Sequence, residues 1–413
     1  MNFLSTPRRR KFLFASLYLS EGAPIGFIWW ALPTKLRSAG IPIDEITSLT
    51  SFLVLPWIFK FLWAPLIDSL HSQRWSLRYW ILSTQLVMGV SLISLIDLDV
   101  QSRLGFVSAL LMAHALAAST QDAAIDALAI SLVPPNERGT LNGWMQVGML
   151  TGRSLFGGGT LIFGTLFGEQ AVIPFLIAAI WFSSIFLLMS HEPDIVHYET
   201  GSFLFRVTRF TATMKLALKR KSTWLGLLFA GCAGTAYEAV GSIAGPFLID
   251  SGFTTTDVGI FFSLPSVLTM IGGAILGGYT SDKIGRKRSI QIFILTLVLD
   301  ILLLAAFSSL PDGNQKAWMI GLLGGMYFCI GLFTSASYAL FMDITDPKLG
   351  ATQFSAFMGA TNLCESWSTL AIGKFIPVVG YPIAFVTFSL VSLAALPILK
   401  SLIPLKSSSH SQP

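Results

Sequence analysis

The chain has 413 residues, of which 53% are hydrophobic and only 12% are charged. Soluble domains carry about 25% charged residues, so this composition excludes a water-soluble enzyme, a disordered protein and a nucleic-acid-binding protein that acts through a basic surface. The mean hydropathy of +0.68 favours an integral membrane protein. The three cysteines, Cys232, Cys329 and Cys364, lie in apolar stretches without metal-ligand spacing, so we expect no disulfide, no bound metal and no cofactor.

Apolar runs long enough to cross a bilayer recur along the whole chain. A spanning helix needs roughly 20 apolar residues, and these runs are continuous and about twice as long as the strands of a transmembrane barrel. The basic start of the chain precedes a full-length apolar run, so we do not expect a cleaved signal peptide. We predict twelve transmembrane helices, at residues 12–36, 46–69, 79–98, 104–133, 140–165, 171–190, 223–249, 256–281, 289–309, 317–345, 351–377 and 382–404.

The distribution of Lys and Arg predicts the orientation of these helices. With the N-terminus inside, the inner segments hold 20 of the 27 cationic residues and the outer loops hold 4. Cytoplasmic loops carry an excess of Lys and Arg, and an even number of spans puts both termini on the same side. We therefore expect a multi-pass protein of the inner (plasma) membrane, monomeric, with both termini in the cytoplasm.

The two halves of the chain echo one another across a basic segment at its middle. Asp68 and Asp282 end corresponding spans, 214 residues apart, and two further junctions repeat at offsets of 211 and 212. A near-constant offset indicates a duplicated unit. We predict an all-α membrane protein with an N-terminal six-helix bundle at 1–190, a cytoplasmic linker at 191–222 and a C-terminal six-helix bundle at 223–413. Two parallel six-helix repeats resemble the major facilitator fold, with the substrate site between the halves.

A loop motif at the inner end of the eighth predicted span supports this resemblance. Residues 278–288, GYTSDKIGRKR, are similar to the G-x-x-x-D-x-x-G-R-[RK] loop of the major facilitator superfamily. An aspartate at a helix end can accept hydrogen bonds from arginines of the loop and so hold two helix ends together. The predicted gating residues are Asp68, Gly278, Asp282, Gly285, Arg286 and Lys287.

Several motifs in the first half resemble a particular branch of that superfamily. Residues 59–68, FKFLWAPLID, and 121–127, QDAAIDA, followed by 137–139, ERG, resemble the muropeptide permease (AmpG-type) family. Related acetyl-CoA transporters and siderophore permeases of the rhizobactin and pyochelin type share much of this pattern. Residues 20–27, SEGAPIGF, and Arg153 ahead of three glycines are similar to the siderophore group.

Seven charged residues lie near the middle of the predicted spans and form the candidate site. A charge near the middle of a bilayer costs on the order of 2.5–3.5 kcal/mol on insertion scales, so such residues face a wet cavity or pair with one another. We favour a functional cavity over structural pairs inside each bundle. The candidate substrate- and proton-binding residues are Glu21, Lys60, Asp122, Asp126, Arg153, Glu238 and Glu365.

Asp122 and Asp126 stand one helical turn apart, so they share a helix face. We expect Arg153, at a similar depth on the next helix, to be the counter-ion of Asp122. This trio is either a proton-responsive charge pair or a static link between two helices. Trp29 and Trp30 are interpreted as packing residues, because aromatic residues make up 12% of the chain.

The sequence favours a secondary transporter that imports a polar or anionic solute, a muropeptide or a siderophore, together with protons. An exporter of small molecules and an acyl-CoA transporter remain as alternatives. A membrane enzyme should carry His, Ser or paired acids at one membrane face, and a scaffold should carry a soluble extension. The acids here are central and the loops short, so we expect no enzyme and no catalytic residue.

Overall fold

The computed structural model describes residues 2–70, 75–96, 104–133, 135–191, 208, 211–212, 215–309, 315–345 and 350–402, and no strand occurs among them. The linker predicted at 191–222 lies largely outside these residues. In the first half the helices are α1 (Pro7–Gly26), η1 (Phe27–Ala31), α2 (Leu32–Ser38), α3 (Ile43–Leu53), α4 (Leu55–Leu70), α5 (Leu77–Ile93), α6 (Leu104–Leu132), α7 (Pro135–Phe167), η2 (Glu169–Ala171) and α8 (Val172–Leu188). In the second half they are α10 (Lys221–Ala233), α11 (Thr235–Ser242), α12 (Ala244–Asp250), α13 (Thr255–Ser263), α14 (Pro265–Ile284), α15 (Arg286–Phe307), α16 (Gln315–Ile344), α17 (Gly350–Ser392) and α18 (Ala395–Ser401).

These helices confirm the all-α membrane fold. Eight helical segments in the described part of the chain are long and apolar enough to cross a membrane, and Leu77–Ile93 is a shorter apolar helix. One of the eight, Gln353–Ser401, holds two passes, because Gly380 has a φ of +78° and reverses the chain inside α17. This turn falls in the gap predicted between the spans at 351–377 and 382–404.

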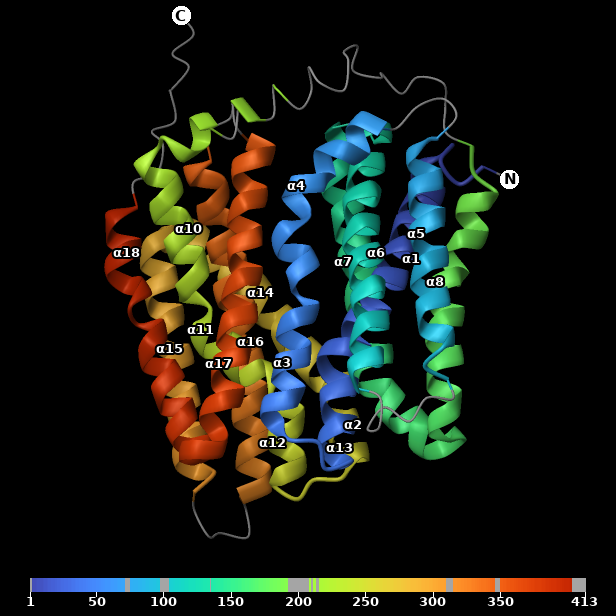
Figure 1. Ribbon diagram of the computed structural model, residues 1–413. Helices are drawn as coiled ribbons and strands as arrows, with labels where there is room; N and C mark the ends of the chain where they lie inside the picture. Colours follow the sequence, from blue (N-terminus) through green and yellow to red (C-terminus); the bar gives the residue numbers. More distant parts are fainter. Residues whose placement is uncertain are drawn as a thin grey trace, which may run out of the picture.

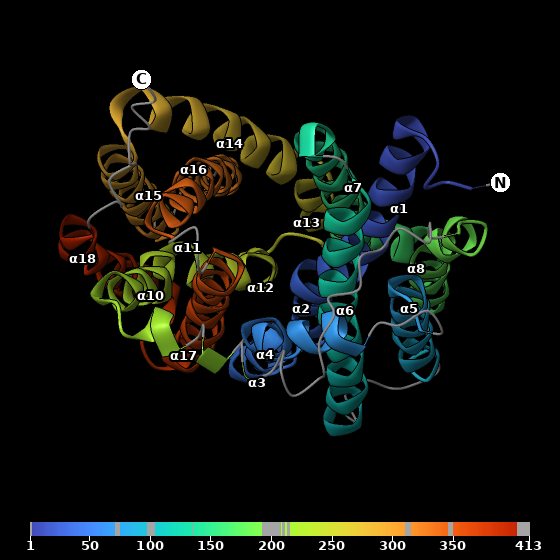
Figure 2. The ribbon, with the colours of Figure 1, turned by 90° about the horizontal axis from the view of Figure 1, so that it is seen from above.

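The helices form two groups that lie side by side (Figure 2). One group contains α1 to α8 and the other α10 to α18. Helices α3 and α4 pack against α17 across the boundary, and α7 packs against α13 in the same way. The chain bounds of the two halves, 1–190 and 223–413, stay a prediction.

The internal repeat reappears in the backbone. Gly40 (φ +85°) and Gly252 (φ +79°) lie 212 residues apart, and so do Gly168 (φ +90°) and Gly380. Glycine is favoured at positive φ because it has no Cβ. Corresponding turns of the two halves therefore share the same left-handed link between consecutive spans.

We name the two ends of the bundle by the chain termini. The first turn of α1 and the last turn of α18 lie at the same end, which is uppermost in Figure 1, and this end is the termini face. Helices α2 and α12 end at the other side of the bundle, which is the opposite face. Between the two faces, large apolar side chains point outward, among them Ile275 (71% exposed) and Leu299 (58% exposed). Such side chains are compatible with contact to lipid.

Helix α1 packs closely against α7 through small residues. A Cβ on Gly22 would lie 2.2 Å from the Met149 carbonyl oxygen, and a Cβ on Gly148 would lie 2.0 Å from that of Ala15. Small residues let two membrane helices approach closely. This contact places Glu21, next to Gly22 on α1, beside the middle of α7.

Candidate functional site

A cavity of about 580 Å³ lies between the two groups of helices, and its walls come from both halves of the chain. Six of the seven candidate charges line it, whereas Asp126 lies beside it. The lining charges are Glu21, Lys60, Asp122, Arg153, Glu238 and Glu365. The structure thus brings together residues that span more than 300 positions in the sequence.

Four charged residues and one tyrosine form a cluster on the first-half wall, here called the Lys60 cluster. Lys60 forms an ion pair with Asp122, and Tyr18 donates a hydrogen bond of 2.6 Å to Asp126. Glu21 is 2% exposed and lines the same cavity as Lys60 and Asp122, and its Oε2 atom has no hydrogen-bond partner among the described residues. The cluster thus contains three carboxyl groups and one ammonium group, which is paired with Asp122. This excess of acids gives the cluster groups that can accept a proton.

Arg153 lies elsewhere, so its predicted pairing with Asp122 is wrong. The guanidinium carbon of Arg153 lies 5.3 Å from the centre of the Trp30 ring, a cation–π contact. Its Nε atom is buried without a hydrogen-bond partner in the described part of the chain. Two acids of the second half, Glu238 and Glu365, line the same cavity as Arg153.

Helix packing explains the error. Helices α6 and α7 follow one another in sequence, but α7 packs mainly against α1 and α13, whereas α6 packs mainly against α5 and α4. Asp122 on α6 therefore faces Lys60 of α4. Arg153 on α7 faces the second half.

Aromatic residues that the sequence analysis assigned to packing form part of the cavity wall. Trp29 and Trp30 lie on η1, a single π-helical turn of five residues, where the Leu32 amide donates to the Phe27 carbonyl. Such turns widen a helix locally and are frequent at functional sites. Trp29 donates its indole hydrogen to Glu365 and lies edge-on to Trp57, with ring centres 5.6 Å apart. The clue in the sequence was the position of both tryptophans on the same helix as Glu21.

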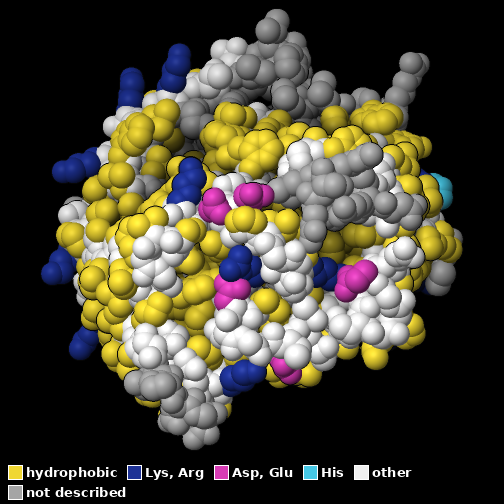
Figure 3. Space-filling model, turned by 60° about the horizontal axis from the view of Figure 1, so that its bottom comes forward, with side chains coloured by type: hydrophobic (Ala, Val, Ile, Leu, Met, Phe, Trp, Pro, Cys, Tyr) yellow, Lys and Arg dark blue, Asp and Glu magenta, His cyan; other side chains and the backbone are white. Residues whose placement is uncertain are grey.

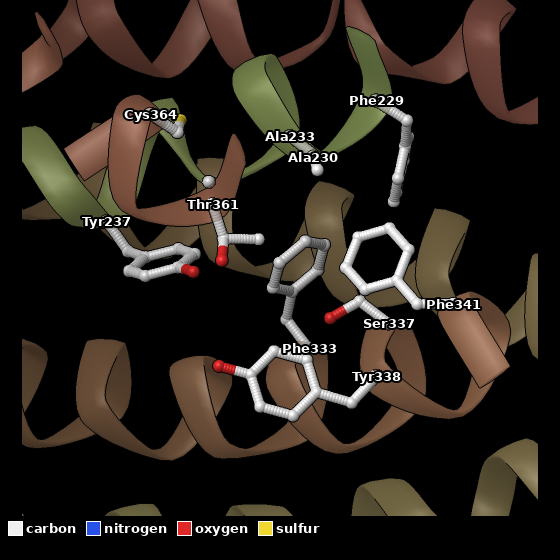
Figure 4. A pocket seen from close by; sticks show the side chains of 11 residues that line it. Phe229, Ala230, Ala233, Tyr237, Phe333, Ser337, Tyr338, Phe341, Thr361 and Cys364 are labelled. Carbon is white, nitrogen blue, oxygen red and sulfur yellow. The ribbon is translucent and has the colours of Figure 1, made fainter. Parts of the chain in front are cut away.

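A smaller pocket adjoins the cavity inside the second half (Figure 4). It shares Tyr237, Tyr338 and Thr361 with the cavity. Figure 4 shows hydroxyl groups of these residues near the ring of Phe333. The second-half wall therefore offers hydroxyl groups and aromatic rings next to the acids Glu238 and Glu365.

The predicted gating loop lies at the termini face, where Gly285 (φ +88°) links α14 to α15. Arg286 forms an ion pair with Asp282 and a longer one with Asp343 of α16, at 3.4 Å. Lys287 donates a hydrogen bond of 3.2 Å to the Lys400 carbonyl. The loop thereby connects four helices, α14, α15, α16 and α18, and sequence analysis missed Asp343. Gly278 has no neighbour within 4 Å of an added Cβ, and the side chain of Asp68 lies outside the described residues.

An ion pair joins the two halves at the opposite face, and the sequence analysis missed it. Arg37 Nε donates to both carboxylate oxygens of Asp250, at 2.7 and 3.0 Å. Tyr381 donates a hydrogen bond of 2.6 Å to the same carboxylate, and Arg37 also donates to the Ile41 carbonyl at 3.1 Å. Figure 3 shows basic and acidic side chains side by side on this part of the surface. Arg37 and Asp250 are 213 residues apart, which lies within the range of 211 to 214 found for the internal repeat.

Comparison with known proteins assigns this architecture to a family. The model of the Major Facilitator Superfamily matches residues 14–373. The chain is 25% identical over 396 residues to "Putative transporter AmpG 4" of Rickettsia felis, covering 93% of this chain and 94% of that protein. It is also 25% identical over 385 residues to "Anhydromuropeptide permease" of Escherichia coli K12, covering 92% and 76%. Because these relatives are transporters, the prediction that the chain is not an enzyme is confirmed.

Solved structures show the same fold at low sequence identity. The nucleoside transporter NupG matches with a TM-score of 0.75 and 12% identity, covering 97% of this chain and 99% of that one. A D-xylose–proton symporter matches with a TM-score of 0.73 and 11% identity, covering 95% and 97%.

Proposed function

The chain belongs to the Major Facilitator Superfamily and is a multi-pass membrane transporter; on this premise we propose that it imports an anhydromuropeptide or a closely similar solute together with protons. Transport proceeds by alternating access, in which the central cavity opens to one side of the membrane at a time. The relatives named as AmpG transporters and as an anhydromuropeptide permease support this solute class.

The observation that carries the proposal is the chemistry of the central cavity. Arg153 lies over Trp30, and its buried Nε atom has no hydrogen-bond partner among the described residues. It can therefore donate to a carboxylate of the solute. The rings of Trp29 and Trp57 can contact the apolar face of a sugar. A sugar–peptide with free carboxylates offers both groups, and a cavity of about 580 Å³ falls in the size range of small-molecule sites.

The Lys60 cluster is the proton site of this proposal. The cluster has three carboxyl groups and one ammonium group, so it holds more acids than bases. All its members belong to α1, α4 and α6 of the first half. Intramembrane acids of this kind mark proton relays. Protonation of Asp122 would release Lys60, and thereby change the charge that the cavity presents to the solute.

The distribution of cationic residues supports the orientation. Arg8, Arg9 and Arg10 begin α1 at the termini face, and Arg286 and Lys287 begin α15 there. The positive-inside rule then puts the termini face in the cytoplasm and the opposite face outside the inner membrane. The halves at 1–190 and 223–413 move against each other about the linker at 191–222.

Uptake by proteoliposomes tests the function. Purified protein should accumulate radiolabelled anhydromuropeptide when an inward proton gradient is imposed, and an uncoupler should abolish accumulation. Arg153→Ala should abolish uptake, whereas Arg153→Lys keeps the charge and should retain part of it. Asp122→Asn should remove the dependence on the proton gradient before it removes binding of the solute.

The same vesicles separate the alternative solutes. An excess of unlabelled ferric siderophore or of acetyl-CoA should leave uptake unchanged. Accumulation of radiolabelled siderophore or acetyl-CoA in place of radiolabelled anhydromuropeptide would reassign the solute. Accumulation only under an outward gradient would indicate an exporter.

A further inference from the structure

A second small pocket opens beside the central cavity, behind Glu365. It has a volume of about 10 Å³, enough for one water-sized particle. We call it the Glu365 pocket. Its lining residues are Trp29, Thr50, Val54, Ser242, Glu365 and Thr369.

The polar groups around this pocket present oxygen acceptors to it. The hydroxyl of Ser242 donates to the Ala239 carbonyl at 2.9 Å, and that of Thr50 donates to the Ile46 carbonyl at 3.2 Å. Because both hydroxyl hydrogens are donated to backbone carbonyls, the lone pairs of the hydroxyl oxygens remain available to an occupant of the pocket. The Glu365 carboxylate is an acceptor as well when it is ionised.

Thr369 supplies an independent sign of an occupant. The residue is 2% exposed, and its hydroxyl oxygen is buried without a hydrogen-bond partner in the described part of the chain. A buried hydroxyl without a partner is costly, so such groups usually bind water or a ligand. Thr369 lies on the same helix as Glu365, one turn further on, so both side chains face the same pocket.

The charges nearby favour a cationic occupant over a water molecule. Glu238, Glu365 and Arg153 line the same cavity next to the pocket, two acids and one cation. One negative charge is therefore left over when both acids are ionised. Trp29 donates to Glu365 but brings no charge.

We propose that the Glu365 pocket binds one small monovalent cation, Na⁺, through the oxygens of Glu365, Thr369, Ser242 and Thr50. Hard cations prefer oxygen ligands, and the lining residues include no His or Cys. The sequence analysis expected no metal because the three cysteines lack metal-ligand spacing, and an oxygen site for an alkali ion leaves no such spacing in the sequence. Thr50 belongs to the first half of the chain and the other ligands to the second, so a bound cation links the halves.

Direct binding tests the proposal without any solute. Purified full-length protein in lipid nanodiscs is titrated with NaCl at constant pH, and choline chloride keeps the ionic strength constant. Thermal unfolding and intrinsic tryptophan fluorescence are recorded, the latter because Trp29 bonds to Glu365. We expect a saturable rise in Tm and a change in fluorescence with Na⁺.

Three variants connect the response to the pocket. Glu365→Gln should weaken Na⁺ binding about tenfold or more, because a charged ligand is lost. Thr369→Val should weaken it by about threefold to tenfold, whereas Thr369→Ser keeps the hydroxyl and should retain binding. Thr160→Val is the matched control, since Thr160 is a buried hydroxyl on α7 that donates to the Phe156 carbonyl at 2.7 Å, away from the pocket.

Several results would overturn the proposal. They are no Na⁺ response in the folded wild-type protein, an equal response to choline, or an unchanged Na⁺ affinity in Glu365→Gln. A response to pH alone would mean that the pocket holds only a water molecule and that a proton balances Glu365. The cation site rests on the proposed transport function only for its role in transport, because binding of Na⁺ is measured without a solute. A protein that binds Na⁺ but moves no anhydromuropeptide refutes the solute, and one that moves the solute without a Na⁺ response refutes the cation site.

Discussion

The Arg37–Asp250 ion pair joins the two halves at the opposite face, so its strength should determine how readily the halves separate there. We expect that this face opens only when the pair separates, because Arg37 ends the first pass of one half and Asp250 ends the first pass of the other. Neutralising either residue should therefore increase the open population. Reversing one charge should increase it further, and exchanging the two charges, Arg37→Asp with Asp250→Arg, should restore closure.

The size of the effect follows from the geometry. An exposed ion pair contributes about 0–1 kcal/mol, and a hydrogen bond to a charged group about 1.5–3 kcal/mol. The Arg37 and Asp250 side chains are 27% and 25% exposed, so solvent screens part of both interactions. We take about 2 kcal/mol for the pair and the Tyr381 hydrogen bond together, which corresponds to a shift of roughly 30-fold in the open-to-closed ratio.

Distance measurements by electron paramagnetic resonance provide the assay, because they need no solute. Spin labels at Ser38→Cys and Thr256→Cys report across the two halves in a chain whose three native cysteines have been replaced. Arg37→Gln and Asp250→Asn should both add a longer distance, and the charge exchange should remove it.

Lys35→Gln is the control for this experiment, because Lys35 pairs with Glu169 within the first half and does not bridge the halves. It should leave the distances unchanged. Identical distances in every variant would refute the reasoning, and so would a charge exchange that behaves like the single reversals.

Three further predictions concern the Lys60–Asp122 pair, the gating loop and the orientation in the membrane. Lys60→Met leaves Asp122 buried without its partner and should destabilise the protein by about 3–5 kcal/mol in thermal or denaturant unfolding; Lys60→Met with Asp122→Leu should regain stability, and a double variant as unstable as the single one would contradict the pairing. Asp282→Asn and Asp343→Asn should each lower the transport rate without changing solute preference, as measured by initial uptake of competing solutes, because both residues bond to Arg286 at the termini face. Reporter fusions at the C-terminus and in the linker at 191–222 should both read as cytoplasmic, and a periplasmic signal from either would refute the orientation.

Much of the fold could be predicted because membrane spans depend on local composition. Length and hydropathy determine where a helix crosses, and the turn at Gly380 falls between two predicted spans. The repeat was visible as a constant offset, and Gly40 and Gly252 show it again in the backbone. These features need no knowledge of which helix packs against which.

The partners inside the site could not be predicted for the same reason. Depth along a helix is readable from sequence, and it put Asp122 and Arg153 at similar levels. The direction in which each residue points depends on packing between helices that are distant in sequence, such as α1 with α7. The role of Trp29 was hidden as well, because its partner Glu365 lies 336 residues away. The Arg37–Asp250 pair could have been suspected, since its spacing of 213 lies within the repeat offsets of 211 to 214 and both residues lie at the ends of corresponding helices, α2 and α12.

The two proposed cation sites, one for a proton and one for Na⁺, differ in the helices that build them, so they can serve different steps of one transport cycle. The Lys60 cluster is built from α1, α4 and α6 alone, so its protonation does not require that the halves be in contact. The Glu365 pocket takes Thr50 from α3 and its other ligands from α11 and α17, so it exists only while these helices are together. A ligand shifts a conformational equilibrium only as far as it binds one state better than the other. On the two proposals made above, a cation at Glu365 would be sensitive to the arrangement of the halves, whereas a proton in the Lys60 cluster would act on the solute through the charge of the cavity.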